Sequence, residues 1–170
     1  MLTTKLSIRI YGDPCLRKKS VPVKKVGPSE RMLIASMIET MQGHKGIGLA
    51  APQVGINEQI FVADIGEGPI AFINPRIKNK KGSEVMEEGC LSIPGVVVKV
   101  KRPQKITVSF LDEQDQKVER EFDGLLARVI QHETDHLKGK LIFDYASSYQ
   151  KLKIKKQLRD IRKQSKKSSS

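Results

Sequence analysis

The sequence predicts an α+β fold in which mostly antiparallel strands surround a central helix, with a further helix toward each end of the chain. Three observations favour this class. Residues 28–43 and 124–137 carry helical patterns, and residues 105–122 alternate in the manner of a β-hairpin. A chain of 170 residues is also long enough to bury one sizeable hydrophobic core, so we expect a single domain.

The first helix is expected over residues 28–43. Leu33, Met37 and Met41 recur at four-residue spacing, which places them on one face of a helix. Gly43 suits the C-terminal end, where glycine is common. The pattern therefore indicates an amphipathic helix that packs on the core.

The middle of the chain carries signals for strands. Three short apolar runs indicate buried strands, at residues 59–64, 70–75 and 96–100. Residues 105–111 alternate between apolar and polar side chains, and a polar turn then leads to a second run at 117–122. We expect these two runs to pair as an antiparallel hairpin.

Two helices are expected after the strands. Asp123 and Gly124 precede a helix that ends near residue 137, and a second helix is expected from about residue 146 to 165. The single domain would then comprise residues 1–165. The last residues, 166–170, are rich in Lys and Ser and are expected to be a disordered tail.

The positive charge of the chain is concentrated near its C-terminus. The net charge is +12, and residues 145–170 carry +8 of it, from nine Lys or Arg and one Asp. The N-terminus lacks the apolar stretch of a signal peptide. A membrane-spanning helix needs about 18 consecutive apolar residues, and no run in this chain approaches that length. Two cysteines are too few for a disulfide scaffold. We therefore expect a cytoplasmic protein with no membrane partner.

Two of the three histidines lie together in the stretch VIQHETDHLKG. His132 and His136 are four residues apart on the predicted helix, so both imidazoles can reach one metal ion. Glu133 lies one residue further round, where its carboxylate can contact a water at the metal without being a ligand. Leu125 and Val129 share the face of the two histidines. Because this face is apolar, we favour an inward-facing site over a pair of surface histidines.

A pair of histidines needs a further ligand, because catalytic metal sites commonly have three protein ligands and one open position. No histidine follows His136, so His44, Cys15 and Cys90 remain as soft ligands. A lone cysteine is usually a small buried hydrophobe. Cys90 lies between an expected strand and a Pro-Gly turn, and its thiolate would bind Zn(II) or Fe(II) strongly. The incomplete histidine pair favours Cys90 as the third ligand.

The stretch HKGIGLAAPQVG, residues 44–55, is rich in small residues. It has no Gly-Lys-Ser/Thr and follows a helix rather than a strand, so it does not fit a P-loop. Gly48 and its small neighbours would allow the backbone to approach a bound molecule closely, although a tightly packed loop would use the same residues. Gln53 carries an amide that could donate a hydrogen bond to an oxyanion.

Three stretches together resemble the signature motifs of bacterial-type peptide deformylases: GIGLAAPQ at 46–53, EGCLS at 88–92 and QHETDH at 131–136. Their order and spacing match that family, and the similarity extends from about residue 5 to residue 165. The resemblance implies a peptide deformylase-like fold. It also implies a hydrolase that removes the formyl group from the N-terminal formyl-methionine of nascent polypeptides and releases formate.

The resemblance also implies roles for individual residues. It assigns one divalent metal ion to Cys90, His132 and His136, with Fe(II) expected in the cell and Zn(II), Ni(II) or Co(II) able to occupy the site. Glu133 would take a proton from the attacking water and deliver it to the leaving amine. The Gln53 side chain and the Leu91 backbone N–H would stabilise the oxygen of the tetrahedral intermediate.

The substrate is expected to lie extended between two segments of the chain. One segment contains Gly48, and the other precedes Cys90 and contains Glu88 and Gly89. The methionine side chain would enter an apolar pocket formed by Ile47, Leu125 and Val129.

Two further features concern the recognition of the substrate and the residues that support the metal site. Many relatives carry Arg or another polar residue near position 97, where this chain has Val97, so contacts to the second or third substrate residue are not implied. Arg102 and Asp135 are candidates for an ion pair that supports the site, although the sequence is equally consistent with an ordinary ion pair on the surface.

The basic C-terminal helix predicts a polyanionic partner. Its apolar stripe, Leu152, Ile154, Leu158 and Ile161, would dock on the body, and its opposite face would remain basic. A face of this charge attracts polyanions, and salt weakens the attraction. By resemblance, we expect contact with the ribosome, where N-formylmethionyl nascent peptides emerge, rather than with a specific nucleic-acid sequence.

Two other functions remain open on the residues alone. One is another HExxH metallopeptidase, which would cleave internal bonds of unformylated peptides. The other is a basic ribosome- or RNA-associated protein with a structural metal. That function requires a closed site, with His44 or Cys15 as the fourth ligand.

Overall fold

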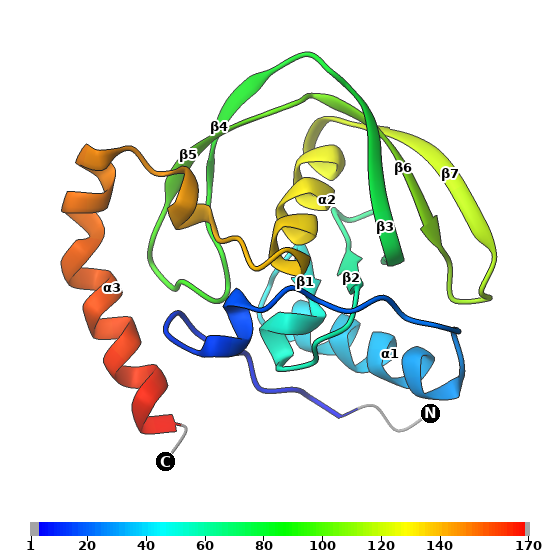
Figure 1. Cartoon of the computed structure of the whole chain (residues 1–170), viewed down its shortest axis with the longest axis horizontal. Coiled ribbons are helices and arrows are strands. Elements are labelled where there is room, and N and C mark those ends of the chain that lie inside the picture. Colours follow the sequence, from blue (N-terminus) through cyan, green and yellow to red (C-terminus); the bar gives the residue numbers. More distant parts are fainter. Residues whose placement is uncertain (1–3, 169–170) are drawn as a thin grey trace.

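The computed structural model describes residues 4–168 (Figure 1). Its α-helices are α1 (Pro28–Gly43), α2 (Gly124–Leu137) and α3 (Ser148–Ser168), and its short 3-10 helices are η1 (Pro14–Arg17), η2 (Ala51–Val54) and η3 (Ile142–Tyr145). Its strands are β1 (Gly48–Ala50), β2 (Ile60–Ala63), β3 (Ile70–Lys81), β4 (Glu84–Glu88), β5 (Val98–Arg102), β6 (Lys105–Leu111) and β7 (Lys117–Asp123). The predicted α+β class is confirmed.

All of the strand ladders are antiparallel. Five strands form one sheet in the order β1-β2-β3-β6-β7, and β4 and β5 form a separate two-stranded sheet. The predicted hairpin is the pair β6–β7, in which Ile106 lies opposite Phe122 and Phe110 opposite Val118. Helix α2 lies in the middle of the molecule, among the strands, as the sequence predicted (Figure 1).

In the five-stranded sheet, β2 and the start of β3 are buried on both faces, which explains their continuous apolar runs. Side chains alternate between the faces of a strand. Ile60 and Val62 pack with α1, whereas Phe61 and Ala63 pack with α2 in a second cluster. Phe61 stacks on Phe72, with ring centroids 4.7 Å apart. A strand covered on both sides in this way cannot shift its register by one residue without exchanging its two faces.

Helix α1 occupies the predicted residues. Its first turn is capped by Glu30, whose carboxylate accepts a hydrogen bond of 2.7 Å from the Gly27 N–H. Met37 and Met41, of the predicted apolar face, are completely buried, and Leu33 is partly buried against the same cluster. The helix thus covers one face of the sheet and holds the segment that leads into β1.

Helix α2 also occupies the predicted residues and ends in a tight turn. The Gly139 N–H donates to His136 O, and Gly139 has a positive φ of 69°. A Cβ at this position would overlap the carbonyl oxygen of Arg17. The glycine therefore ends the helix and also lets η1 pack against the turn.

Helix α3 differs from its prediction at both ends. It begins at Ser148 rather than near residue 146, and it continues to Ser168 rather than ending at 165. Of the tail predicted to be disordered, residues 166–168 are therefore helical, and residues 169–170 lie outside the described part of the chain. Ser165 is buried, so the inner face of the helix is still covered where the predicted helix ends.

The apolar stripe of α3 was predicted correctly except at one position. Leu158 and Ile161 are buried and Ile154 is partly buried, but Leu152 is 70% exposed. Leu152 is two residues before Ile154, so it lies about 200° away around the helix. The prediction grouped it by proximity in sequence rather than by face.

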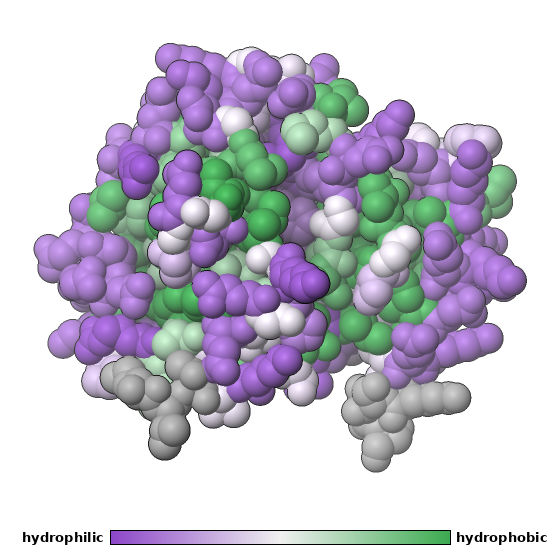
Figure 2. Space-filling view, turned by 180° about the vertical axis from the view of Figure 1, so that it is seen from behind, coloured by the Kyte–Doolittle hydropathy of each residue, from purple (hydrophilic) through white to green (hydrophobic). Residues whose placement is uncertain are grey.

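The surface carries scattered apolar side chains. On the side opposite the view of Figure 1, hydrophobic patches are divided by hydrophilic side chains (Figure 2). None of the helices within residues 4–168 is long and apolar enough to cross a membrane.

Candidate active site

Three side chains predicted as metal ligands meet at one point. Cys90 follows β4, while His132 and His136 lie one turn apart on α2. His136 Nε2 lies 3.3 Å from Cys90 Sγ and 3.2 Å from His132 Nε2. All three ligand atoms are within 4.8 Å of one another. Among the described residues this is the one group of three or more His, Cys, Asp or Glu side chains with such spacing.

The spacing of these atoms fits a single small divalent ion. Metal–ligand bonds of about 2.0 Å to nitrogen and 2.3 Å to sulfur, at tetrahedral angles, separate the ligand atoms by about 3.3 to 3.5 Å. The two other soft ligands that the sequence offered point elsewhere. His44 Nδ1 lies 2.8 Å from Thr40 O, and the Cys15 thiol donates to Pro52 O at 3.4 Å. The donor set thus has three members and leaves room for a reactant.

Glu133 is buried beside this cluster. It is 4% exposed, and its Oε2 has no hydrogen-bond partner within residues 4–168. Burial raises the pKa of Glu133 to about 7, because the charged form loses its hydration. A carboxyl group with such a pKa can both accept and donate a proton near neutral pH.

Gly48 of β1 is required for this position of Glu133. A Cβ at residue 48 would overlap Glu133 Oε1 and would lie 2.8 Å from Val129 Cγ1. The backbone of β1 therefore approaches α2 more closely than any side chain would allow. The sequence indicated a close approach here, but it did not indicate that the neighbour would be the glutamate.

The Gln53 amide is held in one orientation. Its Oε1 accepts a hydrogen bond of 2.8 Å from the Ala50 N–H, so its Nε2 points toward Cys90 Sγ at 3.6 Å and Ser92 Oγ at 3.2 Å. The Leu91 N–H has no backbone or side-chain acceptor in the described part of the chain. Two hydrogen-bond donors therefore lie beside the ligand cluster.

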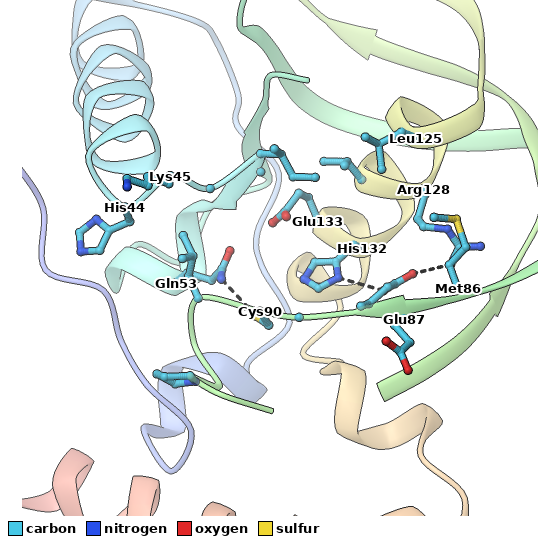
Figure 3. A pocket seen from close by; sticks show the side chains of 18 of the residues that line it. His44, Lys45, Gln53, Met86, Glu87, Cys90, Leu125, Arg128, His132 and Glu133 are labelled. Atoms are coloured by element: carbon cyan, nitrogen blue, oxygen red, sulfur yellow. Dashed lines mark hydrogen bonds and ion pairs between the residues drawn. The ribbon is translucent and has the colours of Figure 1, made fainter. Parts of the chain in front are cut away.

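A cavity of about 670 Å³ opens onto the cluster. Figure 3 shows Cys90, His132 and Glu133 at its centre, with Gln53 on one side and Arg128 on the other. All six residues predicted to bind substrate line it: Ile47, Gly48, Glu88, Gly89, Leu125 and Val129. The sequence interpretation missed Met86 and Arg128, which also line it. Both had a usable signal, because Arg128 lies one turn before His132 and Met86 lies two residues before Glu88.

Glu88 joins the cavity to a buried ionic network. Its Oε2 lies 3.1 Å from His132 Nδ1, and its two oxygens accept hydrogen bonds of 2.7 and 2.9 Å from Arg102. Burial opposes ionisation, but the hydrogen bonds from His132 and Arg102 lower the pKa of Glu88 to about 2. A substrate contact through this side chain would compete with these hydrogen bonds.

The proposed ion pair between Arg102 and Asp135 belongs to the same network. Arg102 Nη1 lies 2.8 Å from Asp135 Oδ2, and Tyr145 donates to the same oxygen at 2.8 Å. The Arg102 side chain is only 5% exposed, so this is a buried support of the site rather than a surface pair.

A three-ligand metal site beside a buried carboxyl group and a cavity defines the chain as a metal-dependent hydrolase. Comparisons with known proteins make this class specific. The family model described as polypeptide deformylase matches residues 5–152. The peptide deformylase of Thermotoga maritima is 48% identical over 155 residues, which cover 91% of this chain and 94% of that protein.

Solved structures agree with the sequence matches. The crystal structure of the Thermotoga maritima peptide deformylase has a TM-score of 0.83 at 48% identity and covers 85% of this chain and 99% of that one. A Synechococcus elongatus peptide deformylase in complex with actinonin has a TM-score of 0.85 at 40% identity, over 95% of this chain and 91% of that one. The chain therefore belongs to the polypeptide deformylase family, and the resemblance read from its motifs is confirmed.

Membership of this family establishes the class of reaction. The chain is a hydrolase that removes the formyl group from N-terminal formyl-methionine in a reaction that depends on a divalent metal. The alternatives of another HExxH metallopeptidase and of a non-enzymatic basic protein are not favoured.

Proposed function

We propose that Cys90, His132 and His136 hold the metal and that Glu133, Gln53 and Leu91 carry out the deformylation of nascent chains. The convergence of the three ligand atoms supports the first part. When bound, the ion supplies a Lewis acid that polarises the formyl group and acidifies the attacking water. Fe(II) is the proposed ion in the cell, with Zn(II), Ni(II) or Co(II) as substitutes, because thiolate and imidazole ligands suit all four.

Glu133 acts first as a general base and then as a general acid. It takes a proton from the water that attacks the formyl carbon, and it delivers this proton to the departing amine. The support for this role is its burial beside the ligand cluster, its raised pKa and its Oε2, which lacks a partner among the described residues. Formate and a free N-terminal methionine are the products.

Gln53 and Leu91 stabilise the negative charge that develops on the formyl oxygen. The Gln53 Nε2 is held by the bond between its Oε1 and the Ala50 N–H, and the Leu91 N–H is available in the described structure. Donors that are already oriented cost little reorganisation during the reaction. Each such donor is worth roughly 100- to 1000-fold in turnover.

The methionine side chain enters the cavity between Ile47, Leu125 and Val129. The peptide backbone lies extended between Gly48 and the segment that contains Glu88 and Gly89. These residues line one cavity with the ligand cluster, which supports this orientation. Val97 is 53% exposed and is not among the residues that line the cavity, so no contact from Val97 to a later substrate residue is proposed.

The basic helix α3 contacts the ribosome, and the enzyme acts in the cytoplasm as one catalytic domain over residues 1–165. The charge of +8 on residues 145–170 supports attraction to a polyanion. Docking there would place the cavity near N-formylmethionyl peptides as they emerge. No sequence-specific nucleic-acid contact is required.

The observation that carries the catalytic part of the proposal is the buried Glu133 carboxyl group in the wall of the ligand cavity. The test is formate release from formyl-Met-Ala-Ser under anaerobic conditions by the Fe(II)-loaded protein and its Glu133→Gln variant. We expect the variant to lose roughly 100- to 10,000-fold in kcat while retaining its metal. Glu39→Gln, on the exposed side of α1, is the matched control and should retain full activity.

Two outcomes would contradict the proposal. Full activity of the Glu133→Gln variant would exclude Glu133 as the base. Cleavage of internal bonds in unformylated Met-Ala-Ser peptides, without formate release from the formylated ones, would instead indicate a metallopeptidase.

A further inference from the structure

The cavity lies between two walls that belong to different parts of the fold. Helix α2 supplies Leu125 and Val129, and the separate β4–β5 sheet supplies Met86 and Glu87. In the described structure the β4–β5 sheet shares no strand ladder with the five-stranded sheet. Side-chain contacts join this sheet to α2 directly: Arg102 of β5 pairs with Asp135, Glu88 of β4 contacts His132, and Arg128 of α2 adds further bonds.

Arg128 makes such contacts with both strands. It rises from α2, is 6% exposed and lines the cavity. Its Nη1 donates to Glu88 Oε1 at 2.7 Å and to Val100 O at 3.1 Å, and its Nη2 donates to Glu84 O at 2.9 Å. These acceptors lie at both ends of β4 and in β5. The planar guanidinium group holds them in a fixed arrangement.

We propose that Arg128 is a specificity-determining residue, because it fixes the distance between α2 and the β4–β5 sheet and so the width of the cavity for the first substrate side chain. A bulky side chain can enter only if the two walls separate. Separation would break buried hydrogen bonds to a charged group, which is costly. A slim, unbranched side chain such as methionine requires no separation. The inference rests on the proposed position of the substrate in this cavity.

Arg128 is not the sole partner of Glu88, which makes the proposal testable. Arg102 also binds both oxygens of Glu88, so loss of Arg128 leaves this carboxylate paired. The Arg128→Met variant therefore removes the three hydrogen bonds from Arg128 to the sheet without leaving an isolated buried charge. The contacts of Arg102 with Asp135 and of Glu88 with His132, which also join the sheet to α2, remain in this variant. Methionine also retains the unbranched shape of the side chain.

The experiment compares kcat/KM for formyl-Met-Ala-Ser and formyl-Phe-Ala-Ser in the metal-loaded protein, Arg128→Met, Arg128→Lys and Arg76→Met. We expect the preference for Met over Phe to fall roughly tenfold in Arg128→Met, chiefly through a lower KM for the Phe peptide. Arg128→Lys should behave similarly, because one ammonium group cannot bridge both strands. Arg76→Met, at an exposed site on β3, should leave the ratio unchanged.

The hydrogen-exchange rates of the backbone amides of residues 84–102 measure the mobility of the β4–β5 sheet without depending on turnover. We expect faster exchange of these amides in Arg128→Met and no change in Arg76→Met. An unchanged Met:Phe ratio in the folded Arg128 variants would overturn the proposal, even if exchange became faster. If Arg128→Met failed to fold, the ratio in Arg128→Lys would decide. A wild type that released no formate would instead refute the proposed function itself.

Discussion

Helices α2 and α3 both carry charged residues, but the two helices place them in opposite surroundings. On α2, Arg128 and Glu133 are buried, and Asp135 is held by Arg102 and Tyr145. On α3, Lys156 and Arg159 are among several exposed basic side chains. The same residue types are therefore fixed individually in one helix and solvated in the other.

The difference shows how burial changes what a charge can do. A buried charge must be paired, so its position is defined and it can act on one atom of a substrate or support one neighbour. An exposed charge keeps its freedom and contributes only to the total field, which salt screens over about 8 to 10 Å. α2 is thus suited to chemistry, and α3 to electrostatic attraction.

The strongest test of this comparison is the Gly48→Ala substitution. Its Cβ would overlap Glu133 Oε1 on α2, so the carboxyl group or β1 must move. We expect kcat/KM for a formyl-Met peptide to fall roughly 100-fold, because a displacement of about 1 Å is sufficient for such a loss. Gly66→Ala is a control, since a Cβ there meets nothing within 4 Å, although its positive φ brings some strain. Equal activity of both variants would show that Glu133 need not be held in place.

A pair of aspartates compares the two helices directly. Asp135 of α2 accepts hydrogen bonds from Arg102 and Tyr145, whereas Asp160 of α3 is exposed. We expect Asp135→Ala to lower the free energy of unfolding by roughly 1 to 3 kcal/mol, because it leaves the buried Arg102 Nη1 without an acceptor. Asp160→Ala should change it by less than about 0.5 kcal/mol. Chemical denaturation measures both, and similar values for the two variants would contradict the distinction.

Local patterns explain which parts of the fold and the site could be predicted. The residues of α1 and α2 follow from periodicity, and the pairing of β6 with β7 follows from alternation around a polar turn. The His132–His136 pair is also local, because helical geometry alone brings the two rings together. Its association with Cys90 needed a chemical argument, namely that two imidazoles make an incomplete metal site.

Contacts between distant segments could not be predicted in this way. Strand β1 has only three residues, so no alternation identifies it, and the small residues of this stretch fit a tightly packed loop equally well. The hydrogen bond of Arg128 to Glu88 joins residues 40 positions apart, and nothing in the local sequence of either residue indicates the other. Arg102 and Asp135 were paired only as candidates, because sequence does not indicate their burial.

The outer face of α3 offers a test of electrostatic attraction to the ribosome. Lys156, Arg159 and Lys163 are exposed and lie on the side opposite Leu158 and Ile161. We expect the Lys156→Gln, Arg159→Gln, Lys163→Gln triple variant to bind ribosomes several-fold more weakly at low salt, with a shallower salt dependence. Activity on free formyl-Met peptides should not change.

The control for this variant removes equal charge from another surface. Lys78, Lys80 and Lys81 of β3 are exposed, and their replacement by Gln lowers the net charge by the same amount. Equal weakening by both triple variants would indicate that total charge, rather than α3, attracts the ribosome.

The smallest expected effect concerns Cys15, which is partly buried and packs against the hydrophobic cluster that also contains Leu158 and Ile161 of α3. Burial, together with the neighbouring Asp13, raises the pKa of Cys15 from 9.0 to about 12. Above pH 9 the unfolded chain therefore loses the thiol proton while the folded chain keeps it, so this group lowers stability as the pH rises toward 12. Serine does not ionise in this range. The stability difference between the wild type and Cys15→Ser should accordingly shrink from pH 8 to pH 10 in denaturant unfolding. A difference that stayed constant would mean that water reaches the Cys15 thiol in the folded chain, so that burial does not oppose its ionisation.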